Sequence, residues 1–88
     1  MDAHKLGSIA IKNLLKRTHT SEKEIEDVIM GQVLTAGSGQ NPARQAAINA
    51  GIPVNTPAHV INQVCGSCSR AVISGYQSLK LGEANKII

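Results

Sequence analysis

The first part of the chain alternates apolar and polar positions with the period of an α-helix. Between Asp2 and Lys16 the serine and lysine residues gather on one narrow strip. The opposite side is a wide apolar stripe made of Leu6, Ile9, Ala10, Ile11, Leu14 and Leu15. This pattern predicts a helix over 2–16 that packs against a larger body. Ser21 and Glu24 then fit a capping box, which predicts a short helix over about 22–26.

Two short segments, 28–33 and 58–64, each contain three β-branched residues and are predicted to be strands. The glycine-rich segment 34–40 between them predicts a loop. It is followed by an Asn-Pro pair, which is typical of a helix cap and a first-turn proline. A second helix is therefore predicted to begin at that pair and to end at 50, where glycine and proline follow.

A third helix is predicted to begin at the sharp bend made by Cys65 and Gly66 and to end at Leu81, with Gly82 as its C-cap. Residues 86–88 are interpreted as the start of a third strand. The alternating order predicts an α/β fold with a mainly parallel sheet and right-handed crossovers. The last strand stops without a turn or cap, and a parallel sheet needs both faces covered, so we expect a truncated domain.

Composition narrows the class of protein. The 88 residues are 42% hydrophobic with Tyr76 as the only aromatic, so one small domain at most is expected. The net charge of +3 includes one cluster, Lys12, Lys16 and Arg17, which has no interleaved aromatics and reads as a solvated helix face rather than a nucleic-acid site. No apolar stretch is long enough for a membrane span or a signal peptide. We expect a cytoplasmic protein with no nucleic-acid or membrane partner.

The main chemical signal is the stretch INQVCGSCSRAV over 61–72, in which a strand delivers Cys65 to a glycine bend and a helix starts at once. The N-terminus of a helix presents unpaired N–H groups and partial positive charge, which favour a thiolate and can hold a developing oxyanion. Cys65 is therefore a candidate nucleophile. A small buried cysteine that fills the corner between strand and helix fits the same pattern, and geometry alone leaves both open.

Longer motifs add a family resemblance. VIMGQVLTAGSGQNPARQAAINAG over 28–51 and NQVCGS over 62–67 resemble, in this order and spacing, the N-terminal half of thiolases of the acetyl-CoA acetyltransferase type. The similarity continues through 70–72 and through LGEA at 81–84. It implies that residues 1–88 are part of the N-terminal domain of the three-layer thiolase fold. It also implies that Cys65 is the acyl-accepting nucleophile.

The resemblance further implies an acyl-CoA substrate, no separate cofactor or metal, and a homo-oligomer in the full-length family. Cys65 would take the acyl group, and a second acyl-CoA, deprotonated at its α-carbon, would receive it in fatty acid metabolism. The family's activating histidine and second cysteine belong to its C-terminal half, so we expect the chain to be inactive alone. His59 lies six residues before Cys65 on the same strand, roughly 20 Å away, and cannot replace that histidine.

Two positions depart from the family pattern. Cys68 stands where glycine is usual and is expected to crowd the acyl pocket, while Ser69 replaces a usual leucine and is expected to weaken helix packing if buried. Cys65 and Cys68 also form a CxxC at a helix start, which is typical of dithiol redox modules. A zinc site lacks a second ligand pair. The remaining alternative is a non-catalytic remnant of a degraded gene.

Overall fold

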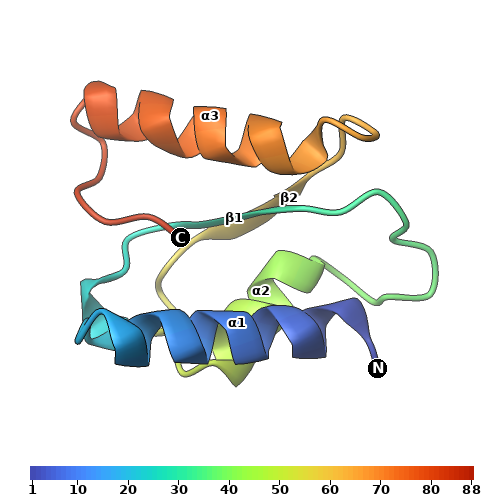
Figure 1. Ribbon diagram of the computed structural model, residues 1–88, viewed down its shortest axis with the longest axis horizontal. Coiled ribbons are helices and arrows are strands. Elements are labelled where there is room, and N and C mark those ends of the chain that lie inside the picture. Colours follow the sequence, from blue (N-terminus) through green and yellow to red (C-terminus); the bar gives the residue numbers. More distant parts are fainter.

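The computed structural model describes residues 1–88 and contains three α-helices, one 3-10 helix and two strands. The elements are α1 (Ala3–Arg17), η1 (Glu22–Glu24), β1 (Val28–Gly31), α2 (Pro42–Asn49), β2 (Ala58–Ile61) and α3 (Ser67–Lys80). The strands lie in the middle, with α1 and α2 on one face and α3 on the other (Figure 1). The layered α/β arrangement expected from the sequence is confirmed. No helix has the combination of length and apolar character that crossing a bilayer requires.

β1 occupies the centre of the sheet. It pairs in parallel with β2, so that Val28 lies opposite Ala58. Along its other edge runs the C-terminal segment, where Ile87 forms a parallel bridge with Asp27. The Ile29 N–H donates to the Ile88 carbonyl at 2.7 Å. The Glu26 N–H donates to the Lys86 carbonyl at 2.9 Å and the Ile88 N–H to the Asp27 carbonyl at 3.1 Å. The predicted third strand is thus a single bridge accompanied by three backbone hydrogen bonds.

Both strands are shorter than predicted, each covering four residues. The predicted strand ends at Val33 and Val64 are wrong, because the Asn62 side chain forms hydrogen bonds with the backbone of both residues. Its Nδ2 donates to the Val33 carbonyl at 3.3 Å, and its Oδ1 accepts from the Val64 N–H at 3.0 Å. An asparagine side chain that satisfies neighbouring backbone groups in this way competes with the sheet ladder.

The helix ends follow the predicted caps. At the start of α2, the Asn41 Oδ1 accepts from the Arg44 N–H at 3.1 Å, with Pro42 in the first turn. Past α3, Gly82 has a φ of 75°, the left-handed conformation that glycine adopts without steric cost. The capping box before η1 is present, although η1 ends at Glu24 rather than near 26.

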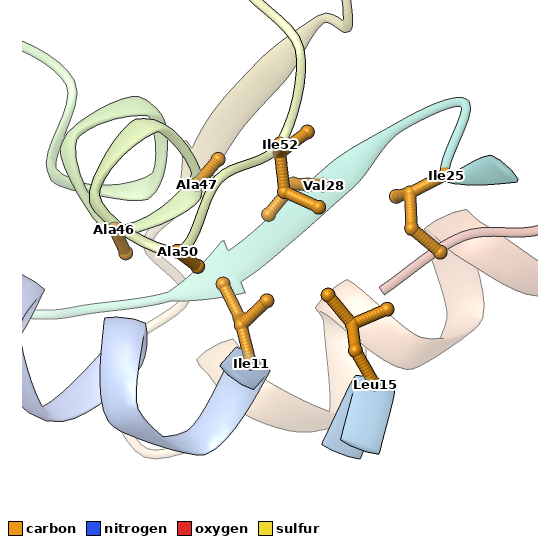
Figure 2. Packing of buried hydrophobic residues seen from close by; sticks show 8 residues of the cluster. All are labelled: Ile11, Leu15, Ile25, Val28, Ala46, Ala47, Ala50 and Ile52. Atoms are coloured by element: carbon orange, nitrogen blue, oxygen red, sulfur yellow. The ribbon is translucent and has the colours of Figure 1, made fainter. Parts of the chain in front are cut away.

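The core lies between α1, α2 and β1 (Figure 2). It consists of Ile11, Leu15, Ile25, Val28, Ala46, Ala47, Ala50 and Ile52. Alanines on the inner face of α2 have short side chains, so the larger residues of α1 can pack close to that helix. The predicted stripe of α1 is only partly covered, because Leu6, Ile9 and Leu14 remain exposed.

Candidate active site at the elbow between β2 and α3

The chain passes from β2 to α3 through two overlapping turns. The first is closed by a 2.9 Å hydrogen bond from the Gly66 N–H to the Gln63 carbonyl, and the second by a 3.2 Å hydrogen bond from the Ser67 N–H to the Val64 carbonyl. Cys65 is a central residue of both turns. The predicted bend at Cys65 and Gly66 therefore exists as an elbow, defined here as residues 62–67.

Ser67 holds the elbow together from inside. It is only 3% exposed, and its Oγ donates to the Val64 carbonyl at 2.6 Å while accepting from the Gln63 N–H at 2.8 Å. One buried hydroxyl thus satisfies a donor and an acceptor on the two residues that precede Cys65. A buried hydroxyl with both hydrogen bonds made is stabilising, and removing it would leave the Gln63 N–H without a partner, while the Val64 carbonyl would keep only its bond from the Ser67 N–H.

Val64 carries backbone strain next to Cys65. Its φ is 48°, in the region that favours glycine, and its side chain is 66% exposed. A β-branched residue there is a genuine outlier, since its Cβ approaches the carbonyl oxygen too closely. Such strain persists only where the surroundings fix the backbone. The bonds made by Asn62 and Ser67 provide that constraint.

Gly31 allows the backbone at the start of α3 to pack directly against β1. A Cβ atom at this position would lie 2.6 Å from the Cys68 nitrogen and 2.6 Å from the Ser67 carbonyl carbon. No real Cβ approaches backbone so closely, so only glycine allows β1 and the start of α3 to be in contact. Sequence reasoning assigned Gly31 to a strand and missed this role, which depends on a contact between distant segments.

Cys65 is exposed and its thiol is free. The alternative of a cysteine buried in the corner is therefore wrong. The backbone N–H groups of Cys65, Cys68 and Ser69 donate to no acceptor in the chain. Unpaired N–H groups at the start of a helix are suited to stabilising negative charge on a sulfur or a carbonyl oxygen.

No proton acceptor accompanies this thiol. His59 lies exposed on β2, opposite Ile29, and makes no hydrogen bond to Cys65. A side-chain hydrogen bond beside the elbow joins the Arg70 Nε to the Gln63 Oε1 at 2.9 Å and does not involve the thiol. No three His, Cys, Asp or Glu side chains gather as a metal site. The elbow presents an exposed thiol and unpaired N–H groups, and it holds no general base.

Cys68 and Ser69 differ in their surroundings. Cys68 borders an open apolar groove of about 490 Å³ between β1, α3 and the C-terminal segment. Its other lining residues include Met30, Val72 and Tyr76. Ser69 is exposed, so the expected loss of helix packing at this position does not arise in the 88-residue chain.

Comparison with known proteins places this geometry in a family. The model of the thiolase N-terminal domain matches residues 1–88, the whole chain. The chain belongs to the thiolase family. The resemblance found in the sequence motifs is thereby confirmed, and the fold described above is that of the thiolase N-terminal region.

Curated relatives agree with the family match. An acetyl-CoA acetyltransferase of Chromobacterium violaceum is 54% identical over 86 residues, which is 98% of this chain and 22% of the relative. One of Pseudomonas aeruginosa is 51% identical over the same share of both chains. The thiolase chain described here thus spans about a fifth of the length of these relatives.

A solved structure shows the same arrangement. The Acat5 thiolase from Ascaris suum, in complex with coenzyme A, superposes with a TM-score of 0.91 at 40% identity. The match covers 93% of this chain and 22% of that one. The layers, the parallel strands and the order of elements are therefore those of a thiolase.

Proposed function

We propose that Cys65 accepts the acyl group of an acyl-CoA by thioester exchange. Its thiolate attacks the thioester carbonyl, the bond between carbonyl carbon and CoA sulfur breaks, and the CoA thiol leaves with the proton that Cys65 gave up. The observation that carries this proposal is the position of an exposed, free thiol at a strained strand-to-helix elbow in a chain of the thiolase family. The unpaired N–H groups of the elbow support it.

The choice of acyl-CoA as substrate rests on two neighbours. The curated relatives are acetyl-CoA acetyltransferases, and the Ascaris suum thiolase has coenzyme A bound. A second acyl-CoA, deprotonated at its α-carbon, would then receive the acyl group as a new carbon–carbon bond forms and the Cys65 thiol is released. A homo-oligomer is proposed on the family resemblance alone.

The 88-residue chain is proposed to perform no complete turnover. Deprotonation of Cys65 and of the second substrate both need a general base, and the chain holds none at the elbow. A single acylation of Cys65 does not require that base, because a thioester and a thiol exchange slowly at alkaline pH without a catalyst. Labelling and turnover therefore test separate parts of the proposal.

The experiment incubates the chain with acetyl-CoA at alkaline pH and locates the acetyl group by peptide mass spectrometry. C68S and C65S are the matched variants, because each removes one thiol of the pair with minimal change in volume. We expect acetylation mainly at Cys65, retained in C68S and largely lost in C65S. No acetoacetyl-CoA should be formed or consumed.

Two results would count against the proposal. Equal acetylation of Cys65 and Cys68, or acetylation of Cys68 alone, would contradict the assignment of the acceptor. Sustained turnover that disappears in C65S would instead show that the chain carries a base of its own, and the proposed inactivity would be wrong.

A further inference from the structure

Cys65 and Cys68 are the two cysteines of the chain, and both are exposed and free. They lie on either side of Gly66, the N-cap of α3. The function proposed for Cys65 makes no use of the second thiol. This pair is the cluster of reactive side chains that the proposed acyl transfer leaves unexplained.

The backbone brings the two residues onto one turn. Gly66 has a φ of −88° and a ψ of 5°, the values typical of the third residue of a type I turn, and the Arg70 N–H donates to its carbonyl at 2.9 Å. The turn containing Cys65 therefore continues directly into α3. Residues three apart on such a turn have Cβ atoms about 5–6 Å apart, and a disulfide needs roughly 3.5–4.5 Å.

The contraction of roughly 1–2 Å implied by these spacings falls on a first turn with few internal bonds. The N–H groups of Cys65, Cys68 and Ser69 have no backbone acceptor, so moving them breaks no hydrogen bond. The Ser67 hydroxyl holds Gln63 and Val64 on one side of the turn, and Gly31 packs against the Ser67–Cys68 peptide on the other. The Ser67–Cys68 peptide is packed against Gly31, so the adjustment that a disulfide needs falls on the Cys65 side of the turn.

We propose that Cys65 and Cys68 form a reversible dithiol site that reduces a low-molecular-weight disulfide and, once oxidised, masks the acyl acceptor. The thiolate of Cys65 attacks one sulfur of that disulfide and releases the first thiol. The thiolate of Cys68 then attacks the Cys65 sulfur and releases the second. Two protein thiols are oxidised, one disulfide is reduced to two thiols, and the two protons pass to the departing thiolates.

The disulfide prevents acylation because the Cys65 sulfur can form only one of the two bonds, and this step rests on the proposed function of Cys65. A sulfur bound to Cys68 has no thiolate to attack a thioester, so the disulfide and the acyl group exclude one another at the same atom. Reduction restores both thiols. The site would couple acyl transfer to the thiol–disulfide balance of its surroundings.

The first test uses the full chain and glutathione as the probe, with no acyl donor present. The chain and C68S are equilibrated with reduced and oxidised glutathione, quenched with acid, and analysed by intact mass and peptide mapping. The wild-type chain should lose two hydrogen atoms and retain no glutathione. C68S cannot resolve the mixed disulfide and should retain one glutathione at Cys65.

Dilution separates the two products sharply. An internal disulfide forms with release of two glutathione molecules, so diluting both forms of glutathione tenfold at a fixed ratio should raise the oxidised fraction over the reduced one about tenfold. A mixed disulfide exchanges one molecule for one, so the same ratio in C68S should not change. A wild-type chain that retains glutathione and ignores dilution would overturn the proposed dithiol site.

The second test joins oxidation to acylation. Oxidised chain freed of glutathione is treated with acetyl-CoA, before and after reduction by dithiothreitol. We expect acetyl-Cys65 only after reduction. If the internal disulfide forms but the reduced chain is never acetylated at Cys65, the proposed function fails and the dithiol site stands. If the chain that was never oxidised is acetylated at Cys65, but the oxidised chain is not acetylated after reduction, reversible masking is wrong.

Discussion

Replacing Val64 by glycine should stabilise the protein, although valine-to-glycine changes normally do the opposite. The reason is the φ of 48° at Val64, which a β-branched residue adopts only with strain. Glycine has no Cβ and adopts this conformation freely. The valine side chain is 66% exposed, so its removal sacrifices little buried area.

The magnitude comes from two opposing effects. Left-handed conformation costs an L-residue roughly 1–2 kcal/mol, which V64G recovers. The greater freedom of glycine in the unfolded chain costs about 0.5–1 kcal/mol. V64G should therefore raise the free energy of unfolding by about 0.5–1 kcal/mol.

Val54 offers a matched control. It is 74% exposed, lies in a turn as Val64 does, and does not have a positive φ. V54G gains nothing from relief of strain and should lower the free energy of unfolding by about 0.5–1 kcal/mol. The two variants, which make the same chemical change, are thus expected to shift stability in opposite directions.

Urea unfolding followed by circular dichroism measures both differences, at several protein concentrations so that any self-association is seen. A change in the midpoint with an unchanged slope reports stability alone. If V64G lowers the midpoint as much as V54G does, the backbone at Val64 is not strained. The description of the elbow as a constrained segment would then be wrong.

Two further substitutions and one pH effect test the contacts around the elbow and the C-terminal segment. G31A places a Cβ 2.6 Å from the Cys68 nitrogen and should lower the free energy of unfolding in urea by on the order of 1–3 kcal/mol. G75A places a Cβ inside a helix at an ordinary contact distance of 3.5 Å and should raise the free energy of unfolding by about 0.5–1 kcal/mol. Equal effects would contradict the close approach of β1 to α3. Hydrogen bonds from the Lys86 ammonium and the Ser21 N–H, with the attraction of Lys86, hold the pKa of Glu24 below its ordinary value. A carboxyl whose pKa is lowered in the folded state stabilises the protein at neutral pH and loses this contribution as pH falls through that pKa. E24Q should therefore reduce the fall in melting temperature between neutral and acid pH, and the control E83Q should leave that fall unchanged.

Local signals in the sequence were enough to predict the helices and their caps. Asn41 before Pro42 and Gly82 after α3 each act through groups a few residues away. The strand ends could not be predicted in the same way. The second strand was predicted to continue past Ile61 to Val64, but the side chain of Asn62 hydrogen-bonds the backbone of both Val33 and Val64, and the pairing ends there.

The candidate site shows a similar division. Cys65 could be singled out because a strand, a glycine and a helix start coincide in the sequence. Its exposure could not, since the same pattern fits a buried corner. The roles of Gly31 and Ser67 depend on which backbone atoms come to lie beside them after folding, and one strand glycine or one helix serine looks like any other in a single sequence.

The strain at Val64 becomes intelligible only through these non-local contacts. Gly31 brings the start of α3 down onto β1, which leaves few residues in which the chain can reverse from strand to helix. Ser67 then fixes the carbonyl of Val64 and the N–H of Gln63 with one buried hydroxyl. With both ends held, the reversal falls on Val64, and Cys65 follows it with an exposed thiol and unpaired N–H groups around it. The exposure of the Cys65 thiol is therefore a consequence of close packing on its two sides.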